Sequence, residues 1–71
     1  MNYDLFIEDS AGNLYSDYTA IRVDRPVPVP MVGDEIEIED VGVVKVKSRR
    51  FCYLYDEESA TLTMRATVKC G

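Results

Sequence analysis

Histidine is absent from this chain of 71 residues, and only two cysteines are present. Histidine is the side chain that most often performs general acid–base catalysis near neutral pH, so the commonest catalytic group is missing. The sequence also lacks a phosphate-binding glycine loop and the residue spacing of a metal site. We therefore expect a protein that is not an enzyme and that binds no metal or cofactor.

Long apolar runs are missing as well, since no stretch approaches the roughly 20 residues of a membrane-spanning helix. Residues 1–4 show neither the basic start nor the apolar stretch of a signal peptide, so we expect a cytoplasmic protein. Apolar residues make up 46% of the chain and charged residues 30%, which is typical of a globular protein. Residues 1–71 are expected to form a single domain, near the lower size limit for a core without disulfides or metals.

The two cysteines, Cys52 and Cys70, are expected to be reduced. The strand pairing inferred below places Cys70 opposite Val46, which is six residues before Cys52 in the sequence. At the usual rise per residue, the two thiols are then about 20 Å apart. A disulfide requires α-carbons roughly 4.4 to 6.8 Å apart, so free thiols are predicted, in agreement with a cytoplasmic protein.

The segment from residue 35 to residue 69 alternates between apolar and polar side chains almost without a break, and this period of two is typical of β-strands. Two turns divide it into a three-stranded antiparallel meander over residues 35–70. The first turn, at Asp40 to Gly42, has glycine at the position where such hairpins need a left-handed residue. The predicted register of this hairpin places the following residues opposite each other: Ile38 and Val44, Ile36 and Val46, Glu37 and Lys45, Glu35 and Lys47.

The second turn of the meander lies at residues 56–59. The pairs expected across it are Leu54 with Leu62, Cys52 with Met64, and Val46 with Cys70. This register places Cys52 on the inward face, as a small apolar residue of the core. Unbroken alternation would also point Ser48 and Arg50 inward, so we expect a bulge or sharp bend near residues 48–50.

The N-terminal part is expected to form a hairpin over residues 3–24, followed by a proline-rich connection over residues 25–34. Residues 3–8 form the first strand, the turn cluster at residues 9–13 reverses the chain, and residues 14–18 return as the antiparallel partner. The prolines of the connection lack ladder donors, which favours an extended linker or a sheet margin. Together with the meander, these segments predict an all-β fold: a small partly open β-barrel or a two-layer sandwich of five to six antiparallel strands.

One stretch resembles the opening strands of known small barrels. Pro-Met-Val-Gly-Asp-Glu-Ile at residues 30–36 is followed by Val-Gly-Val-Val-Lys-Val at residues 41–46. A proline, a Val-Gly-Asp turn, a strand and a Gly-Val-Val return strand are similar to the opening of Src-homology-3-like folds and of the Sm-like barrel of small mechanosensitive channels. The resemblance implies a small β-barrel of the kind found in bacterial and phage proteins, and it implies no activity.

Charge is unevenly distributed along the chain, which has a net charge of −5. Residues 1–44 contain ten acidic residues and two arginines, whereas residues 45–71 contain six basic residues and three acidic ones. Such polarity indicates either a charged partner or two halves of one sheet that neutralise each other. The acidic row along the first strand of the meander consists of Asp34, Glu35, Glu37, Glu39 and Asp40.

The candidate binding surface combines aromatic and basic side chains on one face of the meander. If the alternation continues past residue 50, these residues share that face: Arg49, Phe51, Tyr53, Tyr55, Arg65 and Lys69. Aromatic rings and arginine are enriched where proteins bind each other, and the same combination stacks bases and contacts phosphates in single-stranded nucleic acid. A bulge at residues 48–50 would instead turn the three rings inward as part of the core.

We therefore expect a non-enzymatic interaction protein, of bacterial or phage origin, that binds another protein through a sheet face or edge. One alternative is single-stranded nucleic-acid binding by the basic and aromatic face, although the net acidity of the chain argues against it. Another is an acidic inhibitor that uses the acidic row to occupy the nucleic-acid-binding groove of a host defence enzyme. Pairing of a free sheet edge with a second copy would also give a homodimer.

Overall fold

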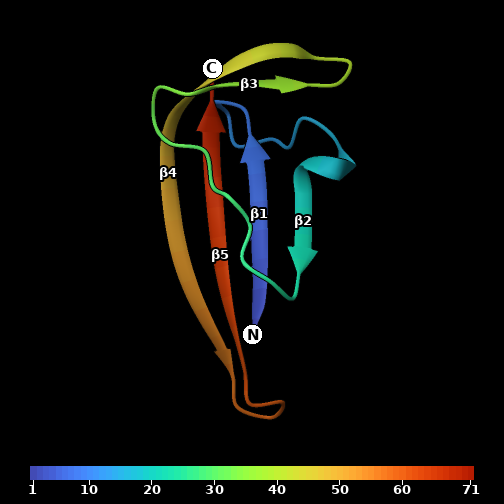
Figure 1. The fold of residues 1–71 in the computed structure, drawn as a ribbon, viewed down its shortest axis with the longest axis vertical. Helices are drawn as coiled ribbons and strands as arrows, with labels where there is room; N and C mark the ends of the chain where they lie inside the picture. Colours follow the sequence, from blue (N-terminus) through green and yellow to red (C-terminus); the bar gives the residue numbers. More distant parts are fainter.

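The computed structural model describes residues 1–71 as five strands and one 3-10 turn (Figure 1). The elements are β1 (Asn2–Glu8), η1 (Asp17–Thr19), β2 (Ala20–Val23), β3 (Glu35–Ile38), β4 (Gly42–Asp56) and β5 (Thr61–Cys70). The strands form one sheet in the order β2-β1-β5-β4-β3, so the predicted all-β class is confirmed. The structure contains no helix that is both long and apolar enough to span a bilayer.

The predicted C-terminal meander is confirmed, because β3 pairs antiparallel with β4 and β4 pairs antiparallel with β5. The register of the first hairpin differs from the prediction by two residues, since Ile36 lies opposite Val44 and Ile38 lies opposite Gly42. Asp40 has a φ of 67° and Gly42 a φ of 111°, so the chain completes its reversal one residue earlier than predicted. A shift of two residues leaves every side chain on its predicted face.

A β-bulge interrupts the β4–β5 ladder between Val46 and Ser48, where Lys47 is the extra residue. Val46 lies opposite Cys70, as predicted. Beyond the bulge every pair is displaced by one residue from the prediction, as the partners show: Tyr53 instead of Cys52 with Met64, and Tyr55 instead of Leu54 with Leu62. The bulge lies just before the predicted range of 48–50. Because side chains alternate, the extra residue exchanges the two faces of β4 for all residues that follow.

The N-terminal hairpin forms, but its return strand begins later than predicted. The turn cluster reverses the chain as expected, since the Asp9 carboxylate accepts hydrogen bonds from the N–H groups of Ala11 and Asn13 and Gly12 has a φ of 89°. Residues 14–18 contribute only an isolated bridge and the start of η1. The antiparallel partner of β1 is β2, because the 3-10 turn delays the return of the chain.

The second edge of β1 pairs with β5 in parallel, from Asn2 opposite Thr63 to Glu8 opposite Lys69. This pairing makes the sheet mixed and leaves it open, which corrects the predicted barrel or sandwich of antiparallel strands. Alternation specifies the faces of a strand, but it does not specify which distant strand lies at its second edge. Pairing with β5 gives both β1 and β5 a strand on each side without closing the sheet.

The apolar core lies on one face of the sheet, which we call the inner face; the opposite one is the outer face. Five buried residues form this core: Leu5, Val46, Ala66, Val68 and Cys70. The proline-rich connection crosses the inner face between β2 and β3 (Figure 1), where Val27 and Val29 pack against the core. Pro28, between them, is exposed. The connection thus forms a second layer over the core, and its prolines are tolerated because this layer needs no strand pairing.

Candidate functional site

Four large apolar side chains at the far end of the β4–β5 hairpin are uncovered on the inner face. We call them the aromatic patch: Phe51, Tyr53 and Tyr55 of β4 with Leu62 of β5. Their exposed fractions are 44%, 67%, 63% and 37%, respectively. The β4–β5 register places the three rings on the face that carries the buried residues Ala66 and Val68. The rings therefore face inward, as a bulge predicts, and yet they remain exposed.

The patch is exposed because the hairpin extends beyond the layer that covers the core. Val27 and Val29 of the connection pack against the core cluster, whereas every residue of β4 from Lys47 to Asp56 is exposed. The molecule is accordingly elongated, with extents of 40 × 21 × 21 Å. The β4–β5 turn forms the end that lies farthest from β3 (Figure 1).

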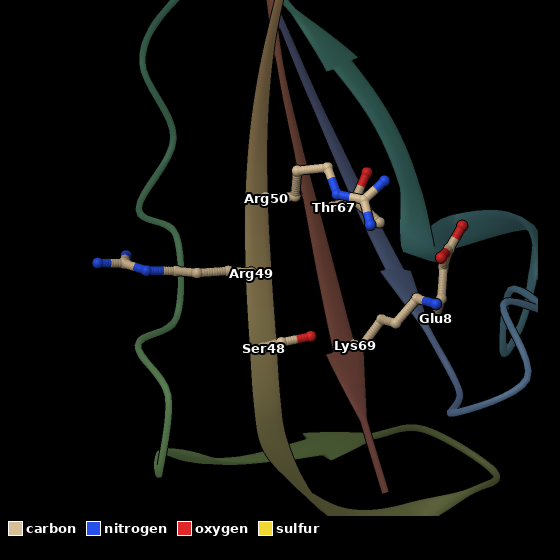
Figure 2. Close-up of a pocket in the computed structure, with 6 residues that line it drawn as sticks. All are labelled: Glu8, Ser48, Arg49, Arg50, Thr67 and Lys69. Atoms are coloured by element: carbon tan, nitrogen blue, oxygen red, sulfur yellow. The ribbon is translucent and has the colours of Figure 1, made fainter.

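Arg49 is the basic residue that adjoins the patch. Its guanidinium carbon lies 5.4 Å from the centroid of the Phe51 ring, which is within cation–π range. In Figure 2, Arg49 extends from one side of β4, while Ser48 and Arg50 extend from the other. Arg49 therefore shares the inner face with the rings, as the spacing of two residues predicts.

Arg65 and Lys69, the other basic residues of the predicted surface, lie on the outer face. Arg65 lies opposite Cys52, and its guanidinium donates to the Asp4 carboxylate at 3.2 and 3.3 Å. The same guanidinium lies 4.9 Å from the centroid of the Phe6 ring. The six residues predicted to share one face therefore lie on two faces, because the bulge exchanges the faces of β4 relative to β5.

Arg65 belongs to a charged cluster that the sequence analysis did not identify. The Asp4 carboxylate accepts hydrogen bonds from Arg22 at 2.7 and 2.8 Å, in addition to those from Arg65. Its side chain is 1% exposed beneath the two guanidinium groups. The hydrogen bonds from Arg22 hold the pKa of this carboxyl below its ordinary value of 3.8; burial opposes this effect, and Arg65 reinforces it. Only the register of β1 with both neighbours brings the three residues together.

The outer face also carries a pocket of about 430 Å³ beside the bulge (Figure 2). Six residues line it, and none is hydrophobic: Glu8, Ser48, Arg49, Arg50, Thr67 and Lys69. Figure 2 shows the side chains of Lys69 and Glu8 extending toward each other, with Arg50 beside Thr67. The acidic side chain of Glu8 offsets part of the positive charge in this pocket, and the Arg49 side chain is directed to the other face, which weakens the pocket as a phosphate-binding surface.

The acidic row surrounds β3, at the end of the molecule opposite the aromatic patch. All five of its residues are exposed, and none of their carboxylates forms an ion pair within 4.0 Å. Glu35 lies opposite Lys45 and Glu37 opposite Val43, so the predicted pairs of Glu37 with Lys45 and Glu35 with Lys47 do not form. The two halves of the chain therefore do not neutralise each other through close ion pairs at this hairpin.

Both cysteines are free thiols. Cys70 is buried opposite Val46, and burial raises the pKa of its thiol. Cys52 is exposed on the outer face, which corrects its predicted inward position, because it follows the bulge. No group of three or more acidic, cysteine or histidine side chains is arranged to hold a metal ion.

No family model matches this sequence, and neither a curated protein nor a solved structure matches it. The aromatic patch, the acidic row and the outer-face pocket are therefore the surfaces from which a function can be inferred. Of these three, the aromatic patch has the chemistry that differs most from an ordinary solvated surface, since it exposes rings on the face that elsewhere forms the core.

Proposed function

We propose that this protein is a non-enzymatic interaction protein that binds another protein through the aromatic patch. The observation that carries the proposal is the exposure of three rings and Leu62 together on the inner face. Large apolar side chains that adjoin each other on a surface favour burial against a partner over contact with water. Aromatic side chains supply most of that gain, because each buries a large apolar area.

The composition of the patch supports a protein partner. Tyrosine and arginine are enriched among the residues that dominate binding energy, and tyrosine combines an apolar ring with a polar hydroxyl group. Phe51, Tyr53 and Tyr55 stand in one row at intervals of about 6.8 Å, on a strand whose pairing with β5 fixes their positions. Arg49 at the end of the row adds donors that suit a partner's carboxylate.

Single-stranded nucleic acid is the less favoured partner of the same rings. Its binding requires cations beside the stacking platform. Arg65, however, is held by Asp4, and Lys69 extends from the outer face (Figure 2). The turn that follows the row also carries three acidic residues, at positions 56–58, which would repel phosphate groups.

Capture of partners from a bacterial lysate tests the proposal, with the tagged chain and its Tyr53→Ser/Tyr55→Ser variant side by side. We expect proteins captured by the wild-type chain to be depleted by at least about tenfold with the variant, because central aromatic residues contribute roughly 2 kcal/mol or more each to an interface. Quantitative mass spectrometry measures the depletion. Both rings are exposed, so the variant is expected to fold, and its melting curve verifies this.

Two further variants assign the loss to the patch. Met31→Ser removes a comparably exposed apolar side chain, 59% exposed, from the connection and should leave capture unchanged. Glu37→Lys/Glu39→Lys alters the acidic row, the alternative docking surface, and should also leave capture unchanged. Equal capture by the wild-type chain and the patch variant, or loss only with the acidic-row variant, contradicts the proposal. Salt-sensitive binding of a labelled oligonucleotide that the patch variant abolishes would assign the rings to nucleic acid instead.

A further inference from the structure

A second uncovered feature of the molecule is the free edge of β4. β3 pairs only with residues 42–45 of β4, and the connection reaches no farther than Val46, which bonds with Gly33 and Asp34. From Lys47 to Asp56, β4 pairs with β5 on one side and with no strand on the other. The backbone groups on that free side are a template for an additional strand.

Charged side chains along this edge change sign from one end to the other. The basic residues lie at its start and the acidic ones at its end, in the order Lys47, Arg49, Arg50, then Asp56, Glu57, Glu58. A second copy aligned in parallel would bring like charges together, whereas an antiparallel copy places the basic start of each edge against the acidic end of the other. Charge often protects an edge from association, but here it is self-complementary in one orientation.

We propose that a second copy of this chain pairs antiparallel with the free edge, about a two-fold axis at Tyr53. An axis perpendicular to the sheet keeps both inner faces on the same side, so each residue must lie opposite a residue of the same face. The axis must therefore pass through a residue position and not between two residues.

The charges select which position this is. With the axis at Tyr53, Arg50 lies opposite Asp56 of the second copy, and this ion pair occurs twice in the dimer. With the axis one residue earlier, at Cys52, Arg50 would lie opposite Leu54 and Asp56 opposite Ser48, so both charges would lose their partners. The Tyr53 register also places Phe51 and Tyr55 of the two copies opposite each other, as an aromatic cross-strand pair.

The dimer would join two sheets into one and place both aromatic patches side by side on a common inner face. It does not depend on the proposed function, because its register is set by the backbone of the edge and by Arg50 and Asp56, which lie outside the patch, although the rings of the patch also meet across the pairing. Conversely, the monomeric charge variants described next retain all the patch residues, and capture experiments with them test the patch alone. An experiment can therefore contradict the proposed dimer without contradicting partner binding by the patch, and the reverse also holds.

Charge reversal tests the pairing in solution. Arg50→Glu sets an acid against Asp56 of the second copy, and Asp56→Arg sets a base against Arg50, so each variant should self-associate at least about tenfold more weakly than the wild-type chain. An equimolar mixture restores attraction at both positions and is expected to form a heterodimer. Sedimentation equilibrium distinguishes the 8.1 kDa chain from a species of twice that mass.

Arg25→Glu is the matched control, because Arg25 is an exposed arginine of the connection and its reversal changes the net charge equally. It should dimerise like the wild-type chain. Asp56 also accepts a hydrogen bond from the Glu58 N–H at 3.0 Å, so recovery in the mixture shows that the loss in Asp56→Arg is not a defect of the turn. A wild-type chain that stays monomeric up to about 1 mM, or a mixture that does not recover, overturns the proposal.

Cysteine cross-linking tests the position of the axis. Tyr53→Cys in a Cys52→Ser background sets two cysteines opposite each other, within disulfide range, so mild oxidation should yield a covalent dimer. Phe51→Cys in the same background is the control, because the two copies of that residue lie four positions apart along the strands, about 14 Å, and should not cross-link. Efficient self-cross-linking of the wild-type chain through Cys52, with none by Tyr53→Cys, overturns the proposed register.

Discussion

Asp4 is a buried carboxylate on the outer face of the sheet, where no second layer covers the strands. It lies beneath the guanidinium groups of Arg22 and Arg65, which themselves remain in contact with water. The carboxylate keeps its charge because its oxygens accept hydrogen bonds from solvated cations. The cluster also joins β2, β1 and β5 on the outer face, opposite the connection.

Replacing Asp4 by asparagine is expected to lower the free energy of unfolding at neutral pH by about 1.5–3 kcal/mol, the range for hydrogen bonds to a charged group. Because the pKa of Asp4 is lower in the folded chain than the ordinary 3.8, this stabilisation is complete well above pH 3.8, starts to fall as the unfolded chain begins to bind a proton, and is lost as the pH falls through the folded value. Urea unfolding across acid pH measures the difference between the two proteins. It should stay constant down to about pH 5 and narrow below that.

Asp24→Asn is the control for this measurement, since both side chains of the Asp24–Arg25 ion pair are largely exposed to solvent. Its stability should follow that of the wild-type chain at every pH. A difference between wild type and Asp4→Asn that persists unchanged at low pH would show that the carboxyl is not held ionised by its two arginines.

Arg49 and the three rings of the candidate site could be named from the sequence, whereas Leu62 could not, and the arrangement of the predicted residues could be predicted only in part. Arg49 and the three rings share a face because residues two apart in a strand always do. The position of Arg65 and Lys69 relative to them depends on the register between two strands, and one extra residue is enough to reverse it. Asp4 and Arg22 were not singled out, because their meeting requires the register of a third strand.

Strands and turns were the most predictable level of this protein. The meander, the turn at residues 9–13 and the proline-rich connection follow from alternation, turn residues and proline spacing. The two register errors, at Gly42 and at Lys47, have one physical origin. Each depends on the backbone conformation of a single residue, which the pattern of apolar side chains does not determine.

The connection is expected to contribute to the apolar core through Val27 and Val29. Val27→Ser/Val29→Ser should lower the free energy of unfolding by about 2 kcal/mol, since both side chains are partly buried against the core. Val32→Ser, a valine of the same connection that is largely exposed, should have little effect. Thermal unfolding measures both variants. A similar loss of stability in the two would show that the connection does not act as the second layer.

The whole molecule was the least predictable level, because the parallel pairing of β1 with β5 joins segments at opposite ends of the chain. Alternation and turn residues are local signals, and neither identifies a distant partner. The expectation of a barrel or sandwich came from short strands joined by turns and from a resemblance over residues 30–46, which are also local features. The chain instead leaves the edge of β4 open over most of its length.

Hydrogen exchange is expected to show this asymmetry across the sheet. β5 lies between β1 and β4, whereas alternate N–H groups of β4 from Lys47 to Asp56 are directed away from β5 and have no strand beside them. These alternate amides should exchange at least about a hundredfold faster than those of β5 in dilute protein, as measured by NMR. Uniformly slow exchange along β4 under those conditions would contradict a free edge.

The position of β5 at the centre of the sheet also determines when this protein can fold during its synthesis. Until residues 61–70 leave the ribosome, only the β1–β2 and β3–β4 hairpins can form, and isolated two-stranded hairpins are marginally stable. Folding then relies on contacts between the two ends of the chain, a topology that is slow to assemble. The nascent chain therefore exposes its aromatic strand to solvent before the strand that fixes its register has been made.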